Sequence, residues 1–285
     1  MKKLLYLLAV ATIFAGYTSA EIEIHPALIV DDIKNTQCNF ATVGHLYSIT
    51  SRPKILKQLA EQLNAENFDA VVFTGDLTID GKDKNWELIN NFFSTIKSKL
   101  LFVPGNHDLM NKEARENWNK HVGYLSKKIS IKECNFILLN STNSLTVDYE
   151  WDKIVPGNGI DDPGIEILKQ MKANTTNLLF MHHTLYSSDL WKVDHGYQTG
   201  DMEKNALLQE KKWNEYVLPY LLNKVKLVYA GDWHSRIVSI TIHDGIVYVA
   251  NGLARMAKSS KQQEQLSYTT TYVKNNGVIL NRIIP

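Results

Sequence analysis

The feature that most constrains the fold of this chain is an apolar segment that ends abruptly in polar residues. Residues 100–103 read Leu-Leu-Phe-Val, which is typical of a buried strand. The Pro-Gly pair at 104–105 ends it, because proline has no N–H to donate and glycine tolerates a sharp exit. Asn106, His107 and Asp108 follow directly. Gly, Asn and Asp are also common turn residues, so by itself the segment allows either a plain turn or a site.

The first half of the chain alternates between strand and helix patterns. We expect strands at 39–43, 69–74 and 100–103, with helices at 53–64 and 85–97 between them. Strands separated by single helices pair in parallel through helical crossovers. Their carboxyl ends then meet at one edge of a sheet, where ligands are usually bound. The polar residues at these three ends are His45, Asp76 and the Asn106 segment.

The second half repeats this pattern less regularly. Further strands are expected at 177–181 and 226–230, followed by His182-His183 and by Asp232-Trp233-His234. Side chains alternate along a strand, so His183 is expected to point away from His182 and to be a pocket or structural residue. The remaining expected elements are one or two strands at 129–139, helices at 165–172 and 213–223, and strands at 236–242, 246–250 and 267–284, with a hairpin turn at Asp244-Gly245.

The composition is that of an ordinary globular protein. The chain has 285 residues, of which 44% are hydrophobic. Its 31 basic and 30 acidic residues give a formal net charge of +1. This balance, without a basic run, does not indicate a nucleic-acid partner.

The N-terminus has the pattern of a secretory signal peptide. Lys2 and Lys3 precede an apolar run at 4–15, and Thr18-Ser19-Ala20 offers small residues for cleavage. The run is too short for a permanent membrane span, although an uncleaved anchor stays an alternative. We therefore expect a signal peptide at 1–20 and one domain at 21–285, secreted or periplasmic. An oxidising compartment permits a disulfide between Cys38 and Cys134, but the sequence leaves this open.

The residues at the strand ends are of the types that bind metal ions. Imidazole and carboxylate groups together suit Zn, Mn or Fe, and a carboxylate can bridge two ions. Paired ions neutralise a phosphate ester, activate a water molecule and stabilise the leaving oxygen. The sequence therefore indicates a metal site with hydrolytic chemistry.

The order of the motifs resembles that of the calcineurin-like metallophosphoesterases. The chain carries, in sequence, Gly75-Asp76, Gly105-Asn106-His107-Asp108, His182 and Gly231-Asp232-Trp233-His234. The resemblance implies an α/β fold, a four-layer α/β/β/α sandwich. It also implies divalent metal ions as cofactors and hydrolysis of a phosphoester by a metal-activated hydroxide.

The resemblance also assigns roles to individual residues. Asp76 is expected to bridge two metal ions, with Asn106 and His182 on the second ion and His45 and His234 on the first. His107 is expected to protonate the leaving oxygen as general acid. Asp108 is expected to orient the His107 imidazole.

Two positions depart from the family pattern. Val43 stands where the family has its first aspartate, and Asp232 stands where it has the first histidine of the last motif. Asp232 is expected to keep a ligand for the second ion, whereas Val43 cannot bind metal. The site is therefore expected to hold two ions, or one if the first site is lost.

Two functions follow from the sequence. The first is hydrolysis of a small or surface-attached phosphoester, either a monoester or a diester. The alternative is a weakened pseudo-enzyme that serves as a binding or assembly module. Val43 and Asp232 favour this alternative, and the intact Asp76, Asn106, His107 and His182 oppose it.

Overall fold

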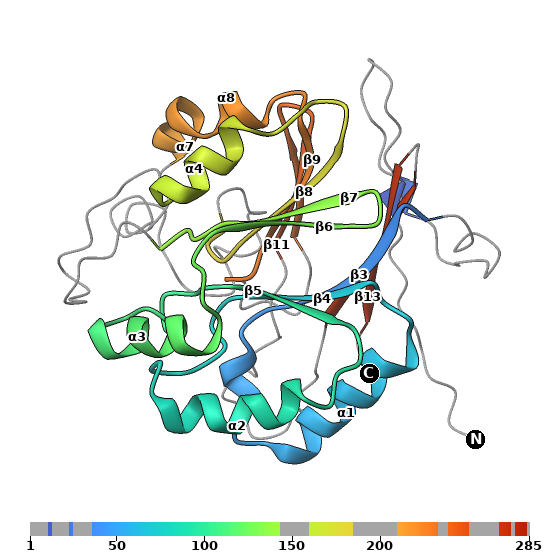
Figure 1. The fold of residues 1–285 in the computed structure, drawn as a ribbon. Helices are drawn as coiled ribbons and strands as arrows, with labels where there is room; N and C mark the ends of the chain where they lie inside the picture. Colours follow the sequence, from blue (N-terminus) through green and yellow to red (C-terminus); the bar gives the residue numbers. More distant parts are fainter. Residues whose placement is uncertain are drawn as a thin grey trace, which may run out of the picture.

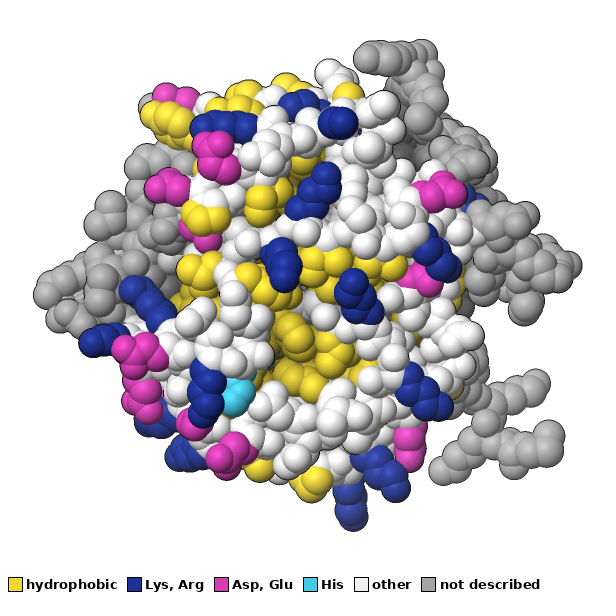
Figure 2. All heavy atoms as spheres, viewed as in Figure 1, with side chains coloured by type: hydrophobic (Ala, Val, Ile, Leu, Met, Phe, Trp, Pro, Cys, Tyr) yellow, Lys and Arg dark blue, Asp and Glu magenta, His cyan; other side chains and the backbone are white. Residues whose placement is uncertain are grey.

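The computed structural model describes residues 11–12, 23–24, 36–142, 160–184, 210–232, 239–250, 268–274 and 277–283. Of the predicted signal peptide only the strand β1 (Ala11–Thr12) lies within this set, so that prediction is not tested. None of the helices in these ranges is long and apolar enough to cross a membrane. On the face shown in Figure 2, Lys and Arg side chains are spread among acidic and apolar ones rather than gathered into one field.

Two mixed sheets form the centre of the fold. One has five strands in the order β13-β12-β3-β4-β5, and the other has six in the order β10-β11-β9-β8-β7-β6. In the first, β3, β4 and β5 are parallel, and in the second β7, β8, β9 and β11 are parallel. The first sheet comprises β3 (Cys38–Val43), β4 (Ala70–Thr74), β5 (Lys99–Val103), β12 (Tyr268–Lys274) and β13 (Gly277–Ile283). The second comprises β6 (Lys127–Ile131), β7 (Cys134–Leu138), β8 (Thr176–Met181), β9 (Val225–Ala230), β10 (Ser239–His243) and β11 (Ile246–Ala250).

Helices cover the outer face of each sheet and give four layers (Figure 1). On the side of the five-stranded sheet are α1 (Pro53–Ala65), α2 (Asp83–Phe93) and α3 (Lys112–His121). On the side of the six-stranded sheet are α4 (Asp162–Lys169), α7 (Glu210–Tyr216) and α8 (Leu218–Leu221). A short 3-10 helix, η2 (Leu46–Ile49), follows β3, and the short β1 pairs with β2 (Glu23–Ile24). The predicted α/β/β/α sandwich is confirmed.

The three interfaces between these layers are three apolar cores. Alternation along β4 sends Val71 and Phe73 toward the helices, while Ala70 and Val72 face the other sheet. Strand β8 behaves likewise, with Phe180 between the sheets and Leu179 against α7 and α8. The middle core is rich in aromatic rings, among them Phe40, Phe136, Phe180 and Tyr229. Because both faces of these strands are covered, one by helices and one by the other sheet, their side chains are apolar on both faces.

The observed elements mostly match those expected from the pattern. The 129–139 segment forms two strands, and the hairpin turn at Asp244-Gly245 is present with positive φ at both residues. The helix expected at 85–97 lies at Asp83–Phe93 instead. Helix α3 was missed because few of its residues are apolar, and only Ala114 and Trp118 are buried. The helix expected at 213–223 is divided into α7 and α8, with Pro219 at the start of the second.

A buried carboxylate joins the two loops that leave β4 and β5. Both oxygens of Asp108 accept hydrogen bonds: from the backbone N–H groups of Leu77, Thr78 and Gly105 at 2.9–3.2 Å, and from the Thr78 hydroxyl at 3.1 Å. Burial and the neighbouring Asp76 carboxylate raise the pKa of Asp108 to about 6, although the three N–H groups favour its ionised form. Asp108 thus fixes the position of the loop that carries Asp76 relative to the loop that carries Asn106.

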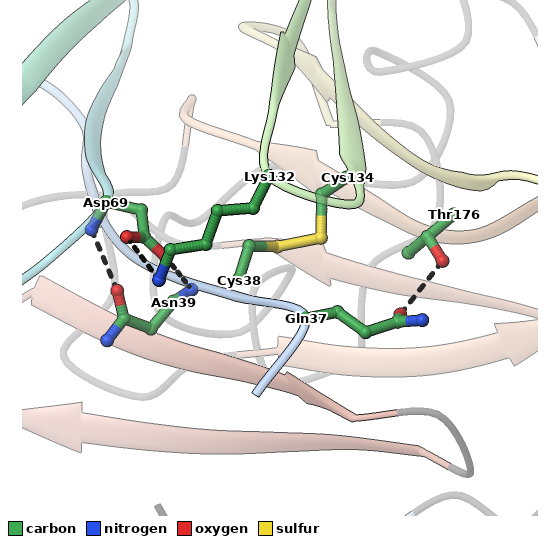
Figure 3. The surroundings of a disulfide bond; sticks show 7 residues. All are labelled: Gln37, Cys38, Asn39, Asp69, Lys132, Cys134 and Thr176. Atoms are coloured by element: carbon green, nitrogen blue, oxygen red, sulfur yellow. Dashed lines mark hydrogen bonds and ion pairs between the residues drawn. A yellow bond between two sulfur atoms is a disulfide. The ribbon is translucent and has the colours of Figure 1, made fainter. Parts of the chain in front are cut away.

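A disulfide joins the two sheets at the end opposite these loops. Cys38 is the first residue of β3 and Cys134 the first of β7, and their sulfurs are bonded (Figure 3). Two polar contacts accompany it, an ion pair between Lys132 and Asp69 at 2.7 Å and a hydrogen bond from Thr176 to Gln37 at 2.9 Å. The disulfide that the sequence left open is therefore present.

We expect Asp108→Ala to lower the free energy of unfolding by about 2–4 kcal/mol, since it leaves three buried N–H groups without an acceptor. Urea denaturation of the metal-free protein measures this. The matched control is Asp83→Ala, which removes an exposed carboxylate paired with Lys120 and His121. This variant should change stability little, because exposed ion pairs contribute little. Equal stability of the two variants would contradict the role given to Asp108.

Removal of the disulfide should also destabilise the fold. The bond closes a loop of 96 residues, and the loss of such a cross-link costs about 2–5 kcal/mol. Cys38→Ala/Cys134→Ala should therefore unfold at lower urea concentration than the oxidised protein. Dithiothreitol should shift the wild type toward the variant and leave the variant unchanged. A variant as stable as the oxidised wild type would show that the two sheets need no covalent link.

Candidate metal centre

The residues that the sequence places at strand ends come together between the two sheets. His45, Asp76 and Asn106 follow β3, β4 and β5 of one sheet, while His182 and Asp232 follow β8 and β9 of the other. His45, Asp76, His182 and Asn106 are all buried. A ring nitrogen of His45, a carboxylate oxygen of Asp76 and a ring nitrogen of His182 lie within 4.8 Å of one another.

The backbone at these loops is bent sharply to bring the side chains together. His45 and Asp76 have φ of 51° and 55°, in the left-handed region that His and Asp adopt more readily than most residues. Gly75 has φ of 89°, and a Cβ there would lie 2.3 Å from Nδ1 of His182. A Cβ on Gly105 would lie 2.2 Å from Oδ1 of Asp76. The glycines of both motifs therefore permit a close approach that no other residue allows.

Asp76 directs one carboxylate oxygen to each half of the site. Its Oδ2 lies 3.5 Å from Nδ1 of His45. Its Oδ1 lies 3.3 Å from Nε2 of His182 and accepts the backbone N–H of His107 at 3.2 Å. The two oxygens of Asp76 thus face different sides of the site, and in this position one carboxylate could contact two ions.

His182 is held with one nitrogen toward the site. Its Nδ1–H donates to the carbonyl of Thr74 at 2.8 Å, which leaves Nε2 facing Oδ1 of Asn106 at 3.1 Å. A backbone carbonyl that fixes one nitrogen of a histidine in this way is common where the other nitrogen binds metal. Burial opposes protonation of His182, but the Asp76 and Asp232 carboxylates and the Thr74 carbonyl raise its pKa.

Asp232 lies closer to the first half of the site than the family pattern implies. Its Oδ1 is 3.0 Å from Nε2 of His45, so His45 stands between two carboxylates. A carboxylate oxygen of Asp232 also lies within 4.8 Å of ring nitrogens of His182 and His183. Val43, by contrast, is buried in the core between the five-stranded sheet and its helices. The chain thus lacks a carboxylate at position 43, where the family pattern has one, and has a carboxylate at position 232, where the family pattern has a histidine.

His107 is partly exposed at the site, but Asp108 does not orient it. The His107 Nδ1–H donates to the carbonyl of Ile79 at 2.7 Å, and the Tyr47 ring lies 4.8 Å from the imidazole. The carboxylate of Asp108 is instead occupied by the backbone of the two loops. The expected contact between Asp108 and His107 is therefore wrong. A backbone carbonyl replaces the carboxylate, because Asp108 is enclosed beneath the loops.

His183 remains beside the site instead of pointing away from it. Its ring centroid is 4.9 Å from that of His182. Strand β8 ends at Met181, so the alternation of side chains does not extend to these two histidines. Burial and the neighbouring His182 lower the pKa of His183 to about 3.

Several groups at the site were not predicted. The carbonyls of Thr74 and Ile79 orient His182 and His107, and the Ser141 hydroxyl binds the backbone of both His182 and His183. Backbone carbonyls leave no signal in a sequence. Ser141 follows a buried strand, as the predicted ligands do, and this position was the only available signal. The predicted ligand His234 lies outside the described residues.

The donor set fits divalent cations. Two imidazoles, two carboxylates and an amide oxygen converge from five loops, with the Asp76 oxygens divided between the two halves. Mixed nitrogen and oxygen donors of this type suit Zn, Mn or Fe. Because Nδ1 of His182 donates to Thr74, Nε2 is the nitrogen directed at the other donors and the one that would bind an ion.

Two known proteins are similar to this chain in sequence. The chain is 28% identical over 159 residues to a 3',5'-cyclic-nucleotide phosphodiesterase of Nostoc sp., with 54% of this chain and 54% of the relative covered. It is 22% identical over 165 residues to a 3',5'-cyclic adenosine monophosphate phosphodiesterase of Haemophilus influenzae, with 56% and 52% covered. The chain thus spans about half the length of these two relatives.

Solved structures share the fold. A dimetal phosphatase from Danio rerio superposes with a TM-score of 0.63 at 13% identity, covering 87% of this chain and 96% of that one. The purple acid phosphatase PPD1 from yellow lupin gives 0.55 at 11% identity, covering 87% and 51%.

A match to a family model assigns the chain to a protein family. The model of the calcineurin-like phosphoesterases matches residues 45–236, from the first histidine of the site to just beyond the last motif. The matched region contains all five donor residues described above, from His45 to Asp232. On this match the chain belongs to the calcineurin-like phosphoesterase family, a family of hydrolases that act on ester bonds.

Proposed function

We propose that this protein hydrolyses a small phosphodiester with two divalent metal ions held between its sheets. The division of the two Asp76 oxygens between the halves of the site carries the proposal. Both curated relatives are named as cyclic-nucleotide phosphodiesterases, which favours a diester over a monoester. The family membership supports ester hydrolysis in general.

The residues of the site divide into two groups around Asp76. Asn106 and His182 would hold the second ion through Oδ1 and Nε2. His45 would hold the first, with His234 contributing as the family pattern implies. When bound, the ions would neutralise the phosphate and lower the pKa of a water molecule.

Asp232 would complete the first group. In the family pattern the first ion receives a carboxylate from the position occupied here by Val43. Asp232 Oδ1 lies 3.0 Å from Nε2 of His45, whereas Asp76 Oδ2 lies 3.5 Å from Nδ1 of the same ring. Asp232 would therefore act on the first ion through His45, because it would accept the Nε2 proton and so direct Nδ1 toward that ion.

His107 would serve as the general acid. The Ile79 carbonyl fixes its ring through Nδ1, and Tyr47 packs against the ring. When the ring is protonated on both nitrogens, Nε2 carries the proton that would pass to the leaving oxygen, and Nδ1–H stays on Ile79. Its partial exposure agrees with a position facing substrate rather than a ligand position.

We also propose an extracytoplasmic location. The basic and apolar N-terminal segment has the pattern of a signal peptide. The disulfide between Cys38 and Cys134 supports the same compartment, because such bonds persist mainly under oxidising conditions.

The function is tested by metal content and hydrolysis together. The purified protein should bind two Mn²⁺ ions per chain and hydrolyse bis(p-nitrophenyl) phosphate and 3',5'-cyclic AMP. His107→Ala should lower kcat about 10²–10⁴-fold and keep both ions, because it removes a proton donor and no ligand. The control His121→Ala should retain activity. Absence of bound metal and of turnover would refute the enzyme and favour a binding module.

The position of Asp232 predicts that its replacement lowers the number of bound ions by one. Asp232→Ala should bind about one Mn²⁺ per chain, because His45 then lacks its neighbouring carboxylate. Metal analysis after gel filtration measures the ratio. Glu166→Ala, which removes an exposed carboxylate paired with Lys169, is the control and should bind as the wild type does. Two ions bound as tightly in Asp232→Ala as in the wild type would exclude this role of Asp232.

A further inference from the structure

A tyrosine ring lies against the imidazole that the proposed function makes the general acid. The ring centroids of Tyr47 and His107 are 4.8 Å apart, with an angle of 35° between the ring planes. This distance lies within the range over which aromatic rings attract each other. Both residues are only partly buried, so the pair lies where solvent, and therefore substrate, reaches the site.

The hydrogen bond to Ile79 does not by itself fix the direction of the His107 ring. Nδ1–H of His107 donates to the Ile79 carbonyl at 2.7 Å. A ring that is held at one atom can still turn about that contact. Tyr47 supplies the second contact, ring against ring. The two contacts together determine the direction in which Nε2 of His107 points.

Tyr47 is itself held in place by the neighbouring loops. It belongs to η2, directly after His45, and its backbone N–H donates to the Asp76 carbonyl at 2.9 Å. The Thr50 hydroxyl donates to the Tyr47 carbonyl at 3.0 Å. Oδ1 of Asp76 accepts the backbone N–H of His107 at 3.2 Å. Asp76 therefore binds the backbone of both members of the pair and fixes Tyr47 relative to His107.

We propose that Tyr47 is a positioning residue that directs Nε2 of His107 toward the leaving oxygen of the substrate. In the hydrolysis of 3',5'-cyclic AMP, water adds to phosphorus, the bond to a ribose oxygen breaks, and that oxygen takes the Nε2 proton. Tyr47 acts on this step only through the orientation of the imidazole. The inference rests on the proposed function and adds a residue that is neither a metal ligand nor the acid.

Kinetics on two diesters with Mn²⁺ test the ring contact. Tyr47→Leu should lower kcat for 3',5'-cyclic AMP about 10–100-fold with little change in KM, because a misplaced catalytic group reacts more slowly. The loss on bis(p-nitrophenyl) phosphate should stay within a few-fold, since nitrophenoxide is a weak base that leaves without a proton. Tyr47→Phe keeps the ring and should stay within a few-fold of the wild type on both substrates. The control Tyr216→Leu removes a half-exposed ring on α7 and should match the wild type.

A double-mutant cycle shows whether Tyr47 acts through His107. In the His107→Ala background there is no imidazole to orient, so Tyr47→Leu should lower kcat no further. An equal loss from Tyr47→Leu in both backgrounds would show that the tyrosine acts independently of His107, and it would overturn the inference. Tyr47→Phe that is as impaired as Tyr47→Leu would also overturn it, because the ring would then not be the group that matters.

Metal content separates this role from an effect on a ligand. The Tyr47 ring centroid also lies 5.6 Å from that of His45, so the ring is near a proposed ligand of the first ion. Tyr47→Leu should nevertheless bind as many Mn²⁺ ions as the wild type. A variant that has lost an ion would assign Tyr47 to the metal site and overturn its role at His107. Circular dichroism establishes folding, and Tyr47→Ser is the second variant if Tyr47→Leu does not fold.

The outcomes also distinguish this inference from the proposed function. A wild type that does not hydrolyse 3',5'-cyclic AMP would refute the proposed function and remove the step that Tyr47 assists. An active wild type that loses turnover in His107→Ala but keeps it in Tyr47→Leu would overturn the role of Tyr47 and leave the proposed function standing.

Discussion

The packing of the two sheets through one apolar layer is the constraint on which the site depends. Phe40, Phe136, Phe180 and Tyr229 fill this layer, and the disulfide joins the sheets at its far end. Because His45, Asp76 and Asn106 leave one sheet while His182 and Asp232 leave the other, the thickness of this core sets the distances between ligands. A change of packing in this core would therefore change the distances between the candidate metal ligands.

Several hydrogen bonds fix the conformation of the loops at the edge of the sheets. Asp108 gathers the loops of β4 and β5, the Thr74 carbonyl fixes His182, and Ser141 fixes the segment after β8. The backbone N–H of Tyr47 also donates to the Asp76 carbonyl at 2.9 Å, which ties the loop of His45 to that of Asp76. Both residues have left-handed backbone conformations, which are costly and persist only where the surroundings enforce them. The site is thus preorganised by groups that need not touch metal or substrate.

The two departures from the family pattern change which carboxylates the site contains. Val43 has joined the apolar core beside the helices, and Asp232 has brought a carboxylate next to His45. Both positions lie at strand ends, where a single substitution changes a ligand without disturbing the strand.

The residue pattern by itself determined the alternating strands and helices and most of the cluster, and the four layers were implied by the family resemblance. Apolar strands followed by His45, Asp76, Asn106 and His182 specify parallel sheets with ligands at one edge, since both signals are local. The pattern does not predict helix α3, because only Ala114 and Trp118 of its residues are buried. The tertiary structure decided the rest: the Ile79 carbonyl rather than Asp108 at His107, the position of Asp232 beside His45, and the return of His183 to the site. These contacts join loops from different strands and involve backbone groups, so neither residue type nor spacing encodes them.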